Sequence, residues 1–502
     1  MKIIKTIGIL FGFLASLSIS ACGSSSDSLS DGLFIYEYLE AEDAYSIKGT
    51  EYNTDKKFVI PSTYKNKPVI ALDDLSLSKN ASLEIVEIPT SIKSIGASVF
   101  LSCRSLTEIN IPDSVTFLGE KAFLGCSCLQ TATLGNGIKS IGKSCFMNCN
   151  SLTSLTIKGP VISFGKDSFK GCDSLTSLDY YGGTANWVDL TGKDEINAKT
   201  RFLNDGDKEI QNLTLPESLK TIDDYAFRNC VSLKTVTLPE QLNKIGNFAF
   251  MGCSNLESIN IPNRLTYFGY SAFQDCPNLQ SISIPLTCET VPANAFDGCK
   301  ALTSVTIEQG ITSIEIDAFA NCASLTSVTI PSSVKEISYS AFENCTSLTS
   351  VSIGSGVTKI YNHAFSGCSS LKSIVIPDNV TFLGSHSFIN CTSLESVALT
   401  KNIKTILMSM FENCTSLKQI NIPYNIKTID ESSFKNCTSL ESVTIPNSVT
   451  KIERNAFYDC NSLTAITFTG TIEEWNAIEI SRYTPFPTTL KVIKCSNGSV
   501  NI

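Results

Sequence analysis

Cysteine and histidine are the residues whose number and spacing could support chemistry in this chain. The 502 residues include 20 cysteines but only 2 histidines. Twenty cysteines are typical of disulfide frameworks or zinc sites, so their spacing must decide between those sites and a structural role. Two histidines leave little room for multi-histidine metal sites or for repeated acid–base pairs.

Fifteen cysteines recur at a fixed interval of 23 residues: Cys103, Cys126, Cys149, Cys172, and the eleven from Cys230 to Cys460. A phenylalanine stands three residues before each of them, as Phe342 does before Cys345 and Phe365 before Cys368. A fixed period of this length is typical of a solenoid, in which each turn buries its apolar face only against its neighbours. The cysteines and phenylalanines therefore form the predicted structural ladder.

The same interval bears on the chemistry of the thiols. Equivalent residues on successive turns lie about 4.8 Å apart with parallel Cβ vectors, wider than the Cβ separation of about 3.8 Å that a disulfide prefers. No Cys-x-x-Cys pair supports a metal site. We predict buried structural thiols, with no metal and no cofactor. The states of four cysteines outside the register stay open: Cys128, Cys145, Cys288 and Cys495.

His363 and His386 are also 23 residues apart and occupy equivalent positions. Stacked imidazoles could bind a metal ion or respond to pH. A pair on the surface lacks a third ligand, and other turns carry a mixture of residue types at this position, such as Ser98, Lys121 and Tyr225. We expect this column to be exposed and to have no function.

Three short segments must position these residues in every turn. Leu-x-x-Val-x-Ile, as in 348–353, directs three aliphatic side chains inward from a strand. Val-x-x-Ile, as in 357–360, predicts a second short extended segment, and Ala-Phe-x-x-Cys fits a single helical or 3₁₀ turn. The sequence thus predicts a solenoid of short parallel strands and single turns, with about 16 turns of 23 residues, interrupted once.

This unit resembles the BspA-like, or Treponema-type, leucine-rich repeat. The segments Phe58-Val-Ile-Pro-Ser-Thr-Tyr64 and Lys67-Pro-Val-Ile70 resemble the strand pair that opens such arrays. The resemblance covers about residues 33 to 502 and implies a leucine-rich-repeat solenoid. It also implies a surface-exposed protein, since some members are adhesins for host matrix or plasma proteins or for other microbes.

The amino terminus has the order of an export signal. Two lysines precede an apolar run, Ile7–Ile19, which is too short to span a bilayer. The run ends in Ile19-Ser20-Ala21-Cys22, which resembles a bacterial lipobox. We expect residues 1–21 to be a signal peptide and 22–32 a lipidated cysteine, Cys22, with a flexible tether. The alternative is an ordinary secretory signal with an incidental cysteine.

The array is interrupted between Cys172 and Cys230, and both tryptophans stand beside irregular segments. Trp187 follows Gly183-Thr184, and Trp475 follows Gly470-Thr471. A solenoid end exposes an apolar cross-section, so each Gly-Thr/Trp motif is expected to cap a turn, with an aromatic platform for sugars as the alternative. The predicted boundaries are 33–70 for the opening segment, 71–178 for the first array, 179–211 for the insert, 212–467 for the second array and 468–502 for the cap.

Hydroxyl and amide side chains fill the outward positions of the strands. The candidate ligand-facing residues are Thr237, Asn260, Ser283, Thr306, Thr329 and Ser352, together with Ser304, Ser327 and Ser350. They are expected to line the concave sheet and to bind a partner's backbone or glycan, with simple solvation of the sheet as the alternative. No aromatic or arginine anchor stands out there, so we expect weak contacts summed over length.

Composition and motifs limit the remaining functional classes. A formal charge of −9 and a pI near 5.1 give no support for nucleic acid or an anionic membrane surface as the main partner. No phosphate loop, His-Glu-x-x-His or Gly-x-Ser-x-Gly motif indicates an enzyme. The sequence favours an adhesin or interaction scaffold, lipid-anchored at the cell surface or outer membrane, that binds host or microbial proteins or glycans. The alternative is a glycan-binding accessory or structural component of a surface uptake system in the envelope.

Overall fold

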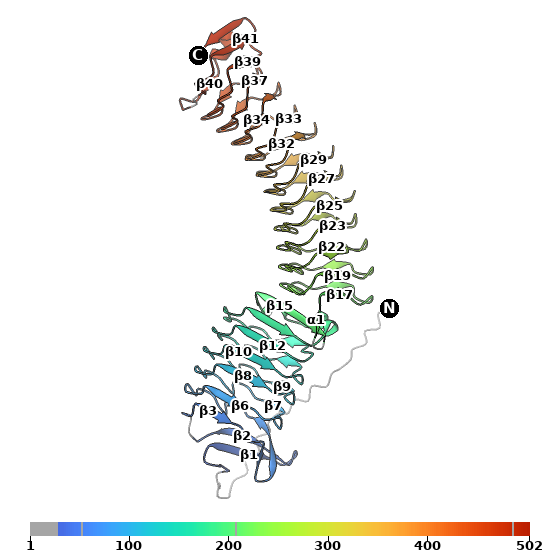
Figure 1. Cartoon of the computed structure of the whole chain (residues 1–502), viewed down its shortest axis with the longest axis vertical. Coiled ribbons are helices and arrows are strands. Elements are labelled where there is room, and N and C mark those ends of the chain that lie inside the picture. The colour runs from blue at the N-terminus through green and yellow to red at the C-terminus, as the bar shows by residue number, and fades with distance from the viewer. Residues whose placement is uncertain (1–28, 52–53, 206–207, 484–485) are drawn as a thin grey trace, which may run out of the picture.

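The repeat coils the chain into a curved rod of stacked turns (Figure 1). The computed structural model describes residues 29–51, 54–205, 208–483 and 486–502. The predicted leucine-rich-repeat solenoid is confirmed. It has about 19 turns, because an opening strand, a strand of the insert and a C-terminal strand add turns outside the 23-residue register. The expected signal peptide and Cys22 lie outside the described residues.

The Leu-x-x-Val-x-Ile segments form a first column of strands, column A, on which the inward aliphatic residues alternate with outward polar ones. Its strands are β3 (Lys57–Val59), β6 (Ile85–Glu87), β8 (Glu108–Ile111), β10 (Thr131–Leu134), β12 (Ser154–Ile157), β14 (Ser177–Tyr180), β15 (Thr200–Asp205), β17 (Asn212–Thr214), β19 (Thr235–Thr237), β21 (Ser258–Ile259), β23 (Ser281–Ile284), β25 (Ser304–Ile307), β27 (Ser327–Ile330), β29 (Ser350–Ile353), β31 (Ser373–Val375), β33 (Ser396–Ala398), β35 (Gln419–Asn421), β37 (Ser442–Ile445), β39 (Ala465–Phe468) and β41 (Val492–Cys495).

The Val-x-x-Ile segments form a second column, column B, of strands that are mostly two residues long. These are β5 (Lys67–Leu72), β7 (Ser94–Ile95), β9 (Phe117–Leu118), β11 (Ser140–Ile141), β13 (Ser163–Phe164), β18 (Thr221–Ile222), β20 (Lys244–Ile245), β22 (Tyr267–Phe268), β24 (Thr290–Val291), β26 (Ser313–Ile314), β28 (Glu336–Ile337), β30 (Lys359–Ile360), β32 (Phe382–Leu383), β34 (Thr405–Ile406), β36 (Thr428–Ile429), β38 (Lys451–Ile452) and β40 (Glu479–Ile480). The strands β1 (Phe34–Leu39), β2 (Ala44–Thr50), β4 (Thr63–Tyr64), β16 (Lys208–Glu209) and β42 (Gly498–Asn501) form antiparallel pairs at the ends and at the insert.

The Ala-Phe-x-x-Cys segment forms hydrogen-bonded turns on the third side of the solenoid. Within one turn the amide of Cys345 donates to the carbonyl of Phe342, the i to i−3 bond of a 3₁₀ turn. Ser340 and Asn344, however, have φ values of 52° and 56°. Left-handed residues interrupt a helical run, so this side consists of separate turns instead of helices.

The structural ladder lies inside these turns. Cys345 and Cys368 are fully buried, and each thiol donates to a phenylalanine carbonyl of the preceding turn, Phe319 and Phe342, at 3.2 Å. Burial raises the pKa of Cys345 to about 12, so the thiol keeps the proton that it donates. The rings of Phe342 and Phe365 stack with centroids 5.4 Å apart and an interplanar angle of 2°.

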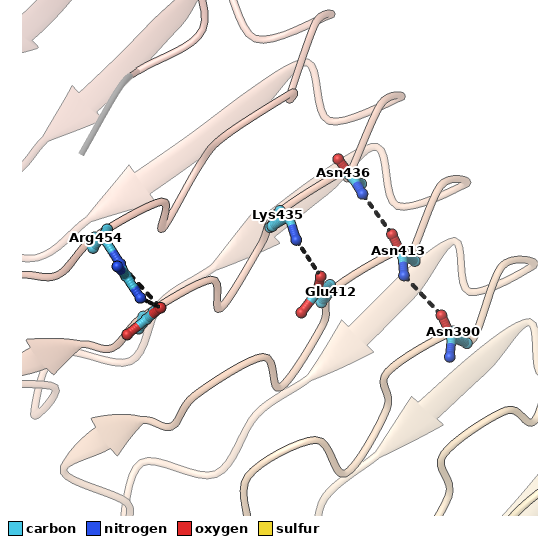
Figure 2. Close-up of polar contacts among 7 residues, drawn as sticks. Asn390, Glu412, Asn413, Lys435, Asn436 and Arg454 are labelled. Carbon is cyan, nitrogen blue, oxygen red and sulfur yellow. Dashed lines mark hydrogen bonds and ion pairs between the residues drawn. The ribbon is translucent and has the colours of Figure 1, made fainter. Parts of the chain in front are cut away.

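Polar side chains join successive turns at the surface. Figure 2 shows the amide ladder in which Asn413 donates to Asn390 at 2.8 Å and Asn436 donates to Asn413 at 2.7 Å. Lys435 forms an ion pair with Glu412 at 2.8 Å, and Arg454 forms one with Glu431. Exposed pairs contribute only about 0–1 kcal/mol each, so these contacts support the register, and the buried core carries most of the stability.

Both Gly-Thr motifs begin a short helix that buries a tryptophan. Trp187 lies on α1 (Thr184–Asp189) and donates its indole N–H to the carbonyl of Ala226 at 2.5 Å. Trp475 lies on α2 (Ile472–Asn476), whose first turn is closed by a capping box between Thr471 and Glu474. The exposed fractions of the two side chains are 0% and 5%, which leaves no ring face free to act as a sugar platform.

The insert also buries two cations that have carbonyl partners. Lys193, on the 3₁₀ helix η1 (Lys193–Glu195), donates to the carbonyls of Leu190 and Val188 at 2.5 and 2.9 Å. Arg201 on β15 donates to the carbonyl of Ile196 at 2.6 Å, and burial lowers its pKa to about 10. Because β15 and β17 belong to different sheets, the insert replaces a strand ladder here, and the rod changes direction (Figure 1). No helix of the described residues is long and apolar enough to cross a membrane.

Replacing Cys345 with serine tests the ladder. We expect a loss of about 1–2 kcal/mol in the free energy of unfolding, because a hydroxyl in this apolar interior is desolvated and packs less well than a thiol. Urea unfolding measures the loss. The matched control is Cys128→Ser, since Cys128 is exposed. Equal stability of the Cys345→Ser variant and the control would remove the structural role of the thiol.

Candidate functional site

The candidate ligand-facing residues lie on adjacent strands of column A with exposed side chains. Ser304 pairs with Ser281, and Thr306 with Ser283, across β23 and β25. Ser327 and Thr329 pair with Ser350 and Ser352 across β27 and β29. Thr237 is exposed at the end of β19. The parallel register thus brings these side chains into rows that follow the rod axis.

The hydroxyls of this strand face differ from other hydroxyls of the surface in their partners. Thr303 and Thr349, one residue before β25 and β29, donate to backbone carbonyls 23 residues earlier, at 3.1 and 3.0 Å. Within the described residues, Thr306 and Thr329 make no hydrogen bond through their hydroxyls. Those two hydroxyls are therefore available to a partner, whereas the hydroxyls of Thr303 and Thr349 hold one turn to the next.

Asn260 does not share this availability. Its amide accepts from the N–H of Leu238 at 2.7 Å and donates to the carbonyl of the same residue at 2.9 Å. The strand β21 ends at Ile259, so the side chain of Asn260 satisfies backbone groups that a longer strand would have paired. The sequence pattern could not separate this asparagine from its free neighbours, because the difference depends on where the strand ends.

The strand face has a hollow of about 400 Å³ in the first array, over β8, β10 and β12. Asn110, Thr133 and Thr156 lie along it in the same column as the candidates of the second array, and Glu108 and Lys158 also line it. The column could be recognised from the sequence, but the hollow could not, since it depends on the sizes of neighbouring side chains. This hollow can accommodate a small polar group of a ligand.

The histidine column is less exposed than we expected. His363 and His386 are half-buried, with rings stacked 4.7 Å apart at 7°. Both have φ of 60°, because this position is the first left-handed residue of every repeat turn. Burial, with repulsion from His363, lowers the pKa of His386 from its usual 6.5, and Glu412 opposes the shift. The described residues hold no group of three or more metal-binding side chains.

The four cysteines outside the register have different environments. Cys145 is fully buried. Cys288 is also buried; its thiol donates to the carbonyl of Leu265 at 3.5 Å, and burial raises its pKa to about 11. Cys128 is exposed and Cys495 is half-exposed. Only these last two are open to reagents from solution, and the buried pair resembles the ladder in environment.

Stability should depend on pH through His386. Unfolded, this histidine binds a proton near its usual pKa of 6.5; folded, it does so only at lower pH. The folded state therefore loses stability as pH falls below about 6.5. We expect His386→Asn to lose less stability than the wild type between about pH 7.5 and 5.5, as measured by urea unfolding. Asparagine tolerates the left-handed backbone. An identical loss in both proteins would contradict the lowered pKa.

The comparisons with known proteins agree with this architecture. The family described as "BspA type Leucine rich repeat region (6 copies)" matches residues 74–187, 201–322, 289–418 and 358–479. No curated protein matches the chain at a significant level.

Among solved structures, a leucine-rich repeat protein from Bacteroides ovatus is 24% identical, with 92% of this chain and 98% of that chain covered and a TM-score of 0.44. A leucine rich cell surface protein from Faecalibacterium prausnitzii is 25% identical, with coverage of 91% and 98% and a TM-score of 0.32. A leucine-rich repeat protein from Eubacterium ventriosum is 22% identical, with coverage of 94% and 98% and a TM-score of 0.32. Because the matched segments of the family span both arrays, the chain belongs to the BspA-type leucine-rich repeat family.

Proposed function

We propose that this protein is a lipid-anchored adhesin and interaction scaffold of the cell surface, which binds proteins or glycans through the exposed face of column A. The observation that carries the proposal is the contrast between free and engaged hydroxyls. Thr303 and Thr349 have partners in the preceding turn, whereas Thr306 and Thr329 on the strand face have none in the described chain. Hydroxyls that the fold does not use can bind a ligand without breaking a contact within the protein.

The chemistry of the face favours partners that supply backbone or sugar groups. Hydroxyls both donate and accept, so they match amide and sugar groups at low desolvation cost. Each hydrogen bond contributes only about 0.5–1.5 kcal/mol, so a row of them over several turns, or many copies on one cell, must act together. A long rod with repeated rows has the geometry for this.

The proposed location rests on the amino-terminal residues. The lysines, the apolar run and the segment ending in Ala21-Cys22 are the parts of a lipoprotein signal in the expected order. A lipid on Cys22 would hold the rod at the membrane while the serine-rich segment keeps it at a distance.

A glycan-binding accessory of a surface uptake system is the second candidate, and the hollow over β8, β10 and β12 favours it. Its polar lining and volume of about 400 Å³ suit a sugar more than a protein loop. In this case the first array, and not the second, would hold the main site.

Protease treatment of intact cells tests the location. We expect the protein to be digested from the outside, because an adhesin must be accessible to its partner. Immunoblotting after digestion, with a periplasmic or cytoplasmic protein as the control for cell integrity, measures the loss. Survival in intact cells with digestion only after lysis would mean an inward-facing protein and would overturn the adhesin proposal.

Paired substitutions test the strand face itself. The double variant Thr306→Val, Thr329→Val removes two free hydroxyls but keeps β-branched side chains, so we expect unchanged melting and about 3- to 30-fold weaker binding. The matched variant Thr303→Val, Thr349→Val removes two hydroxyls that join turns and should melt earlier while binding normally. Retention on matrix-protein and glycan arrays, with the full-length chain in mild detergent, measures binding. Equal retention of both variants would exclude these hydroxyls from the site.

A further inference from the structure

A second hollow lies on the side of column B, away from the strand face. It has a volume of about 310 Å³ and is formed where β22 and β24 lie beside each other. Tyr267 and Tyr270 contribute aromatic rings, Thr266 and Thr290 contribute side chains with hydroxyls, and Glu289 and Glu315 contribute carboxylates. The column B residues vary between turns, so the sequence repeat gave no sign of this hollow.

The two carboxylates make the hollow negatively charged. Neither Glu289 nor Glu315 takes part in any ion pair of the described chain. One carboxylate oxygen of Glu315 accepts the N–H of Ala293 at 3.1 Å, which fixes the direction of that side chain. Two carboxylates without a cation partner attract a positively charged group more than a neutral one.

The aromatic rings of this hollow also favour a cation over a sugar. The ammonium of Lys244 already lies 5.3 Å from the ring centroid of Tyr267, so one ring face binds a cation within the protein itself. Tyr270 packs edge-on against Phe248, with centroids 4.8 Å apart at 81°. The rings therefore do not form the pair of parallel faces between which a sugar ring would stack.

An apolar stripe runs along the rod from this hollow. Tyr270, Ile316 and Tyr339 occupy equivalent positions and have exposed fractions of 46%, 47% and 46%. The ring of Tyr339 contacts Tyr361 at 5.0 Å, and Tyr361 contacts Phe382 at 5.6 Å, which extends the stripe by two turns. Exposed apolar groups gathered in one row, with tyrosine prominent, are typical of a protein-binding surface.

We propose that this surface binds a basic, amphipathic segment of a partner protein. An arginine or lysine of the segment enters the hollow between Glu289 and Glu315, and its apolar side chains cover Ile316 and Tyr339. The guanidinium or ammonium then has carboxylates beside it and an aromatic ring at the wall, and the apolar contact supplies area that charge alone does not. This inference does not depend on the strand face of column A being a binding surface.

The test uses the full-length protein in mild detergent and a fluorescein-labelled dodecapeptide that alternates arginine and leucine. Fluorescence anisotropy measures its binding, with a peptide that has glutamate in place of arginine and one that has serine in place of leucine as comparisons. The key variant is Glu289→Gln, Glu315→Gln, which keeps shape and hydrogen-bonding capacity. The charge-matched control is Glu257→Gln, Glu308→Gln, since those two carboxylates are exposed away from the hollow.

We expect saturable binding of the arginine–leucine peptide, weaker binding of both comparison peptides, and about tenfold weaker binding to the hollow variant, with the control within about twofold of wild type. Ile316→Ser should also weaken binding. Equal weakening in the two charge variants would mean attraction to overall charge and would overturn the proposal. Binding of neutral oligosaccharides that the hollow variant loses would assign the hollow to a glycan and would also overturn it. The strand-face variant Thr306→Val, Thr329→Val should bind the peptide normally, which separates this result from the fate of the proposed function.

Discussion

The structure depends on one constraint: each turn must meet the next in register, group by group, at an interval of about 23 residues. The amide of Thr349 donates to the carbonyl of Thr326 at 2.9 Å, and the amide of Phe342 donates to that of Ala364 at 2.8 Å. Since buried backbone groups must be paired, a single inserted residue would leave a row of them without partners. The stacked phenylalanines and the thiols follow from the same interval, because identical residues then meet identical residues.

Irregular residues occur where the register is interrupted or ends. The insert replaces a regular turn with α1, η1 and β15, and buried Lys193 and Arg201 satisfy carbonyls that no strand ladder reaches. The two tryptophans close apolar cross-sections at the insert and near the carboxyl terminus. The same register also divides the surface into groups that join turns and groups that remain free, and both proposed binding surfaces use free groups.

Much of the fold could be predicted from the sequence, and less of the sites. The period, the two strand segments, the buried phenylalanines and cysteines, and the outward polar positions are visible because the same residue types repeat. The engagement of Asn260, the half-burial of His386 and the hollow beside Tyr267 were not visible. Each depends on distances between side chains of neighbouring turns, where residue types vary and no period reports them.

Deleting one period tests the central claim about register. Removal of residues 346–368 joins Cys345 to Ser369 and takes out one complete turn, so every remaining backbone group finds an equivalent partner. This protein should fold cooperatively and melt close to the wild type, since a solenoid is stabilised mainly by contacts between neighbouring turns. A deletion one residue shorter should lose cooperative melting, because it shifts all later turns relative to the earlier ones. Similar melting of the two deletion variants would contradict the account.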